Sequence, residues 1–335
     1  MAPGETPSSP RAKSFAAILL LSLLWATSNL RPDLLPDLIP ESLPYFASHA
    51  FPLILLAAVS YTFIRQRKGN LPSPIPIQAQ ILPGILIGIA LFVVPAVVAW
   101  FAKSSEPNSA RTALFCLVPV FTIVFQPYLG SARTPNNHAL LAALIAFLGA
   151  LCILPLDYPR SPQALLAFAA LILAVAGVGA ANCLAEAAAN SATQTQAGFS
   201  LTTAIAASTA AILLAAASAI FDREAWLTMA QRGSHFSLAT SLLPALLWSL
   251  LLDLPALILL FWSIKRFSSI RLSTRYLLAP LLTILVGIAF LRAERAIQPR
   301  TWAGLLFIAC GSAYLLFAPE ADASPTTIFS SNQTD

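Results

Sequence analysis

Charged residues are scarce in this chain. Only 10% of its 335 residues are charged, whereas 58% are hydrophobic. A soluble domain carries about 25% charged residues, so this composition excludes an ordinary water-soluble fold. The formal net charge is +5, but the basic side chains lie in short segments between apolar runs and form no single basic surface. That distribution argues against nucleic-acid binding and is typical of residues that set membrane orientation.

Residues that hold metals and cofactors are also few. The sequence has three histidines without metal-ligand spacing, and four cysteines without a Cys-x-x-Cys pair. Neither pattern predicts a metal site. A Gly-x-x-x-x-Gly-Lys-Ser/Thr run, which would bind nucleotide phosphates, is absent from the sequence. We therefore expect no metal and no cofactor, and no nucleotide hydrolysis as a source of energy.

Long apolar segments dominate what is present. Ten of them have the length needed to cross a hydrocarbon core about 30 Å thick, and the alternating pattern of a membrane barrel is absent. The sequence predicts an all-α polytopic membrane protein with ten transmembrane helices, a cytoplasmic N-terminal tail over residues 1–13 and a disordered tail over 319–335. The predicted spans are 14–30, 45–64, 79–102, 112–129, 139–155, 162–184, 197–221, 238–264, 275–291 and 301–318.

Two stretches 161 residues apart repeat one pattern. Leu117–Val124 recurs as Leu278–Leu285, with a proline at the third position of each, Pro119 and Pro280. Each run is followed by a polar break and then by an apolar run that contains a glycine, Gly149 in one copy and Gly311 in the other. An echo at a fixed distance in a very apolar chain indicates a membrane protein built from two repeated halves.

The repeat divides the chain into halves at 14–156 and 162–318. Five spans per half is an odd number, so the second half must be inverted relative to the first, as in many secondary transporters. The densest basic clusters are Arg65–Lys68 and the group from Lys265 to Arg275. They fall on one side if both termini are cytoplasmic, which is the orientation we expect in a bacterial inner membrane.

Two further motifs accompany the Pro119 and Pro280 runs: the stretch from Glu294 to Gly311, and the Leu24–Asn29 run with its tryptophan and asparagine. With these motifs the chain resembles the EamA-type proteins of the drug/metabolite transporter superfamily. The resemblance covers almost the whole chain and implies a ten-helix transporter, with export as the direction. It also implies that Pro119, Pro280, Glu294 and Gly311 serve packing, with Glu294 as a structural latch.

Asp253 is the most informative single residue. It lies near the middle of the eighth span, in the run Leu-Leu-Leu-Asp-Leu-Pro. A carboxylate at that depth costs about 2.5–3.5 kcal/mol on insertion scales, and intramembrane ionisable residues are functional candidates by default. We expect Asp253 to bind a proton or a cationic substrate. The structural alternative is that it hydrogen-bonds backbone groups freed by the kink at Pro255.

Five further residues are candidates for a substrate or coupling site. Asn29 and Asn182 occupy matching places in the first helix of each half, where they line a polar cavity or simply join helices. Glu186 is a gate or cation ligand if its helix continues past it, and otherwise a solvated helix end. Trp25 and Trp248 lie deep enough in their spans to form cavity walls for an aromatic or cationic substrate.

These features favour a secondary transporter over two other classes. We expect alternating-access movement of a small metabolite or drug-like molecule, as a monomer or homodimer in the bilayer, with protons coupled through Asp253. An intramembrane transferase would need paired acids for a metal or a nucleophile with a base, and the spans offer one isolated Asp, so no enzyme is expected. A non-transporting scaffold or sensor stays open, because Ser131 stands where the family usually has a glutamate after the fourth helix.

Overall fold

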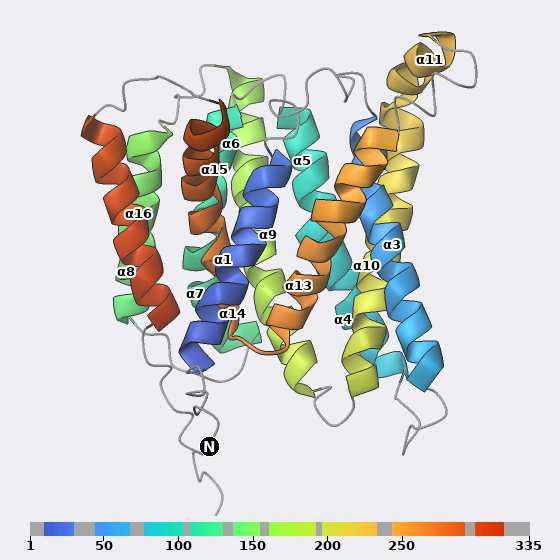
Figure 1. Ribbon diagram of the computed structural model, residues 1–335, viewed down its shortest axis with the longest axis horizontal. Coiled ribbons are helices and arrows are strands. Elements are labelled where there is room, and N and C mark those ends of the chain that lie inside the picture. The colour runs from blue at the N-terminus through green and yellow to red at the C-terminus, as the bar shows by residue number, and fades with distance from the viewer. Residues whose placement is uncertain are drawn as a thin grey trace, which may run out of the picture.

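The computed structural model describes residues 10–29, 44–67, 77–102, 108–129, 137–154, 161–191, 196–232, 243–291 and 299–317. Within these ranges the chain is helical almost throughout and contains no strand (Figure 1). The helices of the amino-terminal part are α1 (Pro10–Asn29), α3 (Tyr45–Arg67), α4 (Ile77–Gly88), α5 (Val94–Ala102), α6 (Asn108–Phe115), α7 (Val118–Leu129) and α8 (Asn137–Ile153). Those of the second part are α9 (Pro162–Ser191), α10 (Gln196–Phe221), α11 (Arg223–Arg232), α13 (Leu254–Ile264), α14 (Ser269–Ser273), α15 (Arg275–Leu291) and α16 (Pro299–Phe317).

Eight helical segments in the described ranges are long and apolar enough to cross a membrane. Two shorter apolar helices, Phe15–Ser28 within α1 and α8, match the remaining predicted spans. In a bilayer the backbone must pair its own polar groups, and continuous helices do so. The prediction of an all-α, multi-pass membrane protein is confirmed.

The helix ends lie close to the predicted ones, with two instructive differences. α1 begins at Pro10, inside the predicted tail, and proline is well suited to a first helical turn because its missing N–H has no partner there. α9 continues seven residues past the predicted end at Leu184, to Ser191. The predicted tail at 319–335 lies outside the described residues.

Two π-helical turns interrupt the third and eighth predicted spans. They are η2 (Ile89–Val93) and η4 (Ser249–Asp253), and their starts are 160 residues apart. Pro95 and Pro255 follow them at that same spacing. Because proline has no backbone N–H for the carbonyl four residues earlier, a wider turn that bonds one residue further along the chain relieves the mismatch.

The fourth and ninth predicted spans are each preceded or broken by a turn. α6 and α7 are separated at Cys116 and Leu117, directly before Pro119, which is buried as the second residue of α7. In the second half a turn at Thr274 separates α14 from α15, and Pro280 lies inside α15. Pro119 thus marks a helix start, because it cannot donate to a preceding turn.

α8 and α16 lie side by side at one flank of the bundle (Figure 1). A Cβ atom on Gly149 would lie 2.6 Å from the carbonyl oxygen of Gly304, and one on Gly304 would lie 2.5 Å from that of Gly149. Gly311 meets the carbonyl oxygen of Ala142 in the same way, at 2.5 Å. Glycine here lets two helix backbones touch, as small residues do in membrane bundles. Gly311 therefore lies at the contact between α8 and α16.

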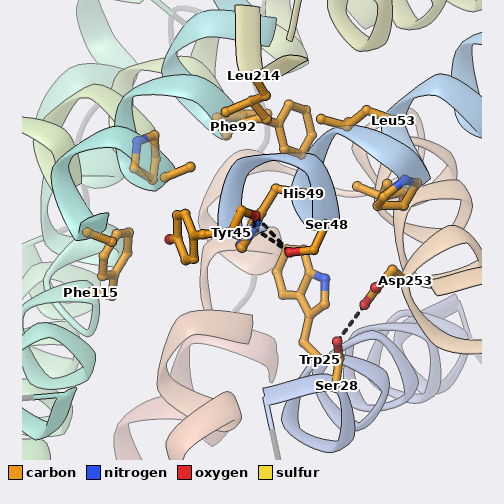
Figure 2. Close-up of a pocket in the computed structure, with 16 residues that line it drawn as sticks. Trp25, Ser28, Tyr45, Ser48, His49, Leu53, Phe92, Phe115, Leu214 and Asp253 are labelled. Atoms are coloured by element: carbon orange, nitrogen blue, oxygen red, sulfur yellow. Dashed lines mark hydrogen bonds between the residues drawn. The ribbon is translucent and has the colours of Figure 1, made fainter. Parts of the chain in front are cut away.

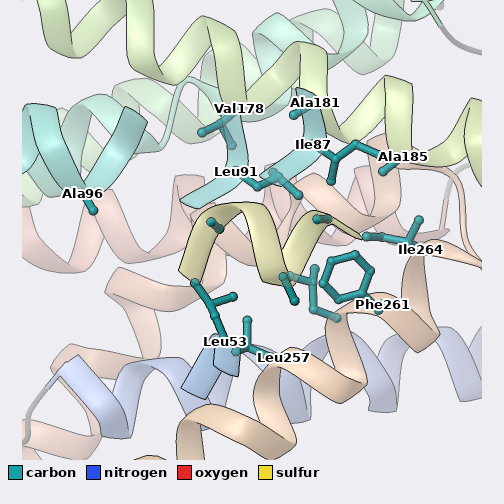
Figure 3. Close-up of a cluster of buried hydrophobic side chains, with 14 of the residues drawn as sticks. Leu53, Ile87, Leu91, Ala96, Val178, Ala181, Ala185, Leu257, Phe261 and Ile264 are labelled. Carbon is teal, nitrogen blue, oxygen red and sulfur yellow. The ribbon is translucent and has the colours of Figure 1, made fainter. Parts of the chain in front are cut away.

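The main core joins α9 and α10 to α4, α5 and α13 (Figure 3). Its α10 face is made of alanines such as Ala206 and Ala210, which are fully buried. Large apolar side chains instead point outward, with Leu173 of α9 74% exposed and Ile212 of α10 67% exposed. The alanines of α10 let neighbouring helices approach closely, and exposed leucine and isoleucine side chains are expected where lipid surrounds the bundle.

Candidate functional site

A cavity of about 500 Å³ lies among α1, α3, α5, α6, α10 and α13, next to both π-helical turns (Figure 2). Its aromatic lining includes Trp25, Phe92 and Phe115, and its polar lining includes Ser28 and Asp253. The lining residues come from both predicted halves of the chain. A largely apolar cavity with a few polar groups is the usual form of a small-molecule site.

Asp253 is the charged member of this lining. It is the last residue of η4 and lies halfway along the 22-residue helical segment Leu243–Ile264. Its Oδ1 accepts a hydrogen bond of 2.5 Å from the Ser28 hydroxyl. Its side chain makes no capping bond to α13, the helix that follows it. The Asp253 carboxylate thus bonds to Ser28 of α1 and lines the cavity.

Tyr45 and His49 form the wall that α3 contributes. Their ring centroids are 4.5 Å apart, and His49 Nδ1 lies 2.8 Å from the Tyr45 carbonyl oxygen. Ser48 donates to the same carbonyl at 2.7 Å. In the sequence His49 lies near the end of a predicted span. Local spacing does not show that His49 shares a cavity with Asp253, so it was not among the predicted site residues.

A fully buried arginine lies behind the aromatic lining. The guanidinium carbon of Arg275 is 5.1 Å from the ring centroid of Trp25 and 4.6 Å from that of Tyr276. Its Nη2 donates to Asn182 Oδ1 at 3.2 Å and to the Tyr276 hydroxyl at 3.0 Å. Tyr276 in turn stacks on Phe115 of the cavity wall, with centroids 6.2 Å apart.

Arg275 is a site residue that sequence reasoning missed. From the sequence it belongs to a basic cluster outside the membrane, whereas in the structure the apolar segment Ser269–Val286 contains it. The deciding feature is α14, whose short helix places the start of α15 inside the bundle. The sequence contained one indication that Arg275 is buried, because this residue directly precedes a long apolar run.

The other candidates lie around this centre or away from it. Asn182 is fully buried beside Arg275. Glu186 is buried, not solvated, and its Oε2 accepts a hydrogen bond of 3.0 Å from the Ser269 backbone N–H, so it caps the start of α14. Trp248 is partly buried, and its indole N–H has no partner. Neither Glu186 nor Trp248 lines the cavity. Glu294 and the side chain of Asn29 lie outside the described residues.

The described residues contain no group of three or more His, Cys, Asp or Glu side chains close enough to hold a metal ion. The cavity chemistry is instead that of a binding site: one carboxylate with a hydroxyl partner, one imidazole, and aromatic walls backed by a guanidinium. Such walls favour flat apolar or cationic groups, and the carboxylate can accept a proton or a hydrogen bond.

Comparison with known proteins identifies a fold and no family. No family model matches the chain, and no curated protein matches it. Nineteen chains of solved structures match. One of them, described only as "Crystal structure of protein", has a TM-score of 0.64 at 16% sequence identity, over 92% of this chain and 98% of its own. At that identity the likeness concerns the fold alone.

Proposed function

We propose that this protein is a secondary transporter that moves a small molecule across the membrane by alternating access. The observation that carries the proposal is the cavity lined from both halves, with Asp253 at mid-span facing into it. Inverted-repeat transporters bind their substrates near the midplane at the repeat interface, often beside interrupted helices. Asp253 ends such an interruption, the π-helical turn η4.

We further propose ten transmembrane helices arranged as two inverted repeats of the EamA type. Some positions that correspond in the two halves of the sequence contact each other, as residues near a pseudo-two-fold axis do. Phe115 and Tyr276, 161 residues apart, stack on each other. Gly149 packs on Gly304. A shift of 162 residues relates Gly149 to Gly311 and Ala142 to Gly304, and Gly311 and Ala142 also pack on each other. The shared spacing of η2 and η4 supports the same relation.

The two halves differ in how tightly they close, which supports alternating access. α4 approaches the backbone of α10 at Gly84 and Gly88, where an added Cβ would collide with Ile205 and Ala206. The position 160 residues after Gly88 is Trp248, whose indole forbids the equivalent approach. The cavity meanwhile extends toward the start of α3 and the end of α5, at Tyr45 and Ala99. A close helix approach in the first half thus corresponds to a bulky side chain in the second.

The coupling of transport to protons that we propose depends on Asp253, the carboxylate that lines the cavity. A protonated carboxyl donates a hydrogen bond and carries no charge, whereas an ionised carboxylate only accepts hydrogen bonds, such as the one from Ser28 to Asp253. Moving a neutral side chain between the two sides of a bilayer is far less costly than moving a charged one. Protons are thus the coupling ion that we propose. We place the protein in a bacterial inner membrane with both termini in the cytoplasm.

The test uses proteoliposomes loaded with the pH indicator pyranine. A panel of small metabolites is added outside, and substrates are those that change the internal pH with the wild-type protein. Asp253→Asn should abolish the proton signal, and Ser28→Ala should weaken it because the hydroxyl partner is lost. Glu224→Gln, an exposed carboxylate on α11, is the matched control. Wild-type proton flux in Asp253→Asn would refute the coupling. A correctly inserted wild type that moves no solute in counterflow assays would favour the scaffold instead.

A further inference from the structure

We propose that the substrate is an organic acid, whose carboxylate binds the guanidinium of Arg275. This inference rests on the proposed transport function, since it assigns the substrate class of that same cavity. The guanidinium of Arg275 has no counter-ion among the described residues. Arg275 is 0% exposed, and no described carboxylate lies within ion-pair distance of it. The guanidinium of arginine is a cation in proteins, so its burial places a positive charge inside the bundle.

The surroundings of Arg275 compensate its charge only in part. Its polar contacts are three neutral oxygens: Asn182 Oδ1, the Tyr276 hydroxyl and, at 3.5 Å, the Leu272 carbonyl. The faces of Trp25 and Tyr276 add cation–π attraction. These contacts offset only part of the cost of burying an ion without a counter-ion. An anion that enters the site would supply what these groups do not.

Two donors beside this charge have no acceptor. The Nε–H of Arg275 and the amide Nδ2 of Asn182 are both buried and without a hydrogen-bond partner. Reversing the Asn182 amide would point its NH₂ group at the guanidinium, so the orientation with Oδ1 toward Arg275 is the favourable one. Buried donors are normally satisfied. A carboxylate accepts several hydrogen bonds and matches the fork of an arginine, which makes it the missing acceptor.

The route from the cavity to Arg275 passes through one side chain. Trp25 lines the cavity and also covers a face of the guanidinium. Phe115, another wall residue, covers Tyr276. A change of the Trp25 rotamer would therefore open the cationic centre to a bound molecule. The aromatic walls suit an acid that also carries an apolar or aromatic body.

The experiment compares three probes that share one skeleton: 3-phenylpropionate, 3-phenylpropionamide and 3-phenylpropylamine. Binding to the purified full-length protein in nanodiscs is measured by tryptophan fluorescence and by the thermal unfolding midpoint. The acid should bind at least tenfold more tightly than the amide and raise the midpoint, and the amine should bind no better than the amide. Arg275→Gln should abolish the preference for the acid, whereas Arg275→Lys should retain part of it. Arg266→Gln, an exposed arginine that lies over Trp262, is the matched control and should leave the preference unchanged.

A second variant keeps the test decisive if Arg275→Gln fails to fold. Asn182→Asp places a carboxylate within reach of Arg275, where it acts as an internal counter-ion. It should raise the unfolding midpoint and reduce acid binding at least tenfold. Equal binding of acid and amide to the wild type, or unchanged acid binding in Asn182→Asp, would overturn the proposal.

The outcomes also separate this inference from the proposed transport. If the amine binds and is transported while the acid does neither, transport stands and the anion assignment fails. If the acid binds through Arg275 but no solute crosses proteoliposomes, the anion site stands and the transport proposal fails.

Discussion

Gly149 offers a quantitative test of the packing between α8 and α16. A Cβ atom placed on it would lie 2.6 Å from the Gly304 carbonyl oxygen, whereas non-bonded heavy atoms prefer about 3.5 Å. In Gly149→Ala the two helices would have to separate by roughly 1 Å, an overpacking that costs about 1–3 kcal/mol in close-packed cores. Alanine also gains about 1 kcal/mol over glycine in a helix. The net effect should be a loss of about 0–2 kcal/mol.

Gly177 of α9 is the matched control. Nothing lies within 4 Å of the Cβ that alanine would add there, so Gly177→Ala should stabilise the protein by about 1 kcal/mol through helix propensity alone. The difference between the two variants isolates the steric cost, which we expect to be about 1–3 kcal/mol. Unfolding by titration with sodium dodecyl sulfate, followed by circular dichroism in mixed micelles, measures both. Equal stability of the two variants would refute the close approach of α8 and α16.

Two buried carboxylates outside the cavity give further predictions. Asp222 accepts hydrogen bonds from the Phe46 N–H at 2.8 Å and the Ser218 hydroxyl at 2.8 Å, so it caps the start of α3. Asp222→Ala should destabilise the protein by about 1–3 kcal/mol. Asp222→Asn keeps a hydrogen-bond acceptor and should destabilise it less. The unfolding midpoints of the two variants check this order of stability, which a purely electrostatic role of Asp222 would not produce. Glu186→Ala should cost a similar amount because the Ser269 N–H loses its acceptor. Glu186→Gln should be milder and should leave substrate binding unchanged, and a loss of binding in that variant would contradict a capping role.

The membrane-spanning helices were predictable because each follows from a local property. An apolar run of sufficient length must pair its own backbone in lipid, so hydropathy and proline positions locate most helix ends to within a few residues. The π-helical turns were not predicted. The sequence indicated a kink at Pro255, and the wider turn that places Asp253 on the cavity became visible in three dimensions.

The cationic part of the site was not predictable, because it depends on contacts between distant segments. Arg275 stands at the edge of an apolar run, where a basic residue ordinarily marks the membrane surface. Its burial results from α14, which turns back into the bundle after Glu186 caps its start. Five residues of α14 carry no strong helical signal by themselves. The contact of Glu186 with Ser269 and the burial of Arg275 thus required the tertiary structure, whereas Asp253 and Trp25 stood out in the sequence.

α1 connects the two charges of the site. Trp25 covers the guanidinium of Arg275, and Ser28, almost one turn further along the same helix, donates to Asp253. A substrate that changes the Trp25 rotamer at Arg275 therefore acts on the helix that also carries the Ser28 hydroxyl. A rotation of this part of α1 would also break the hydrogen bond between Ser28 and Asp253. Occupancy by an acid at Arg275 and the hydrogen bonding of Asp253 would then be linked through one helix, without any direct contact between the two side chains.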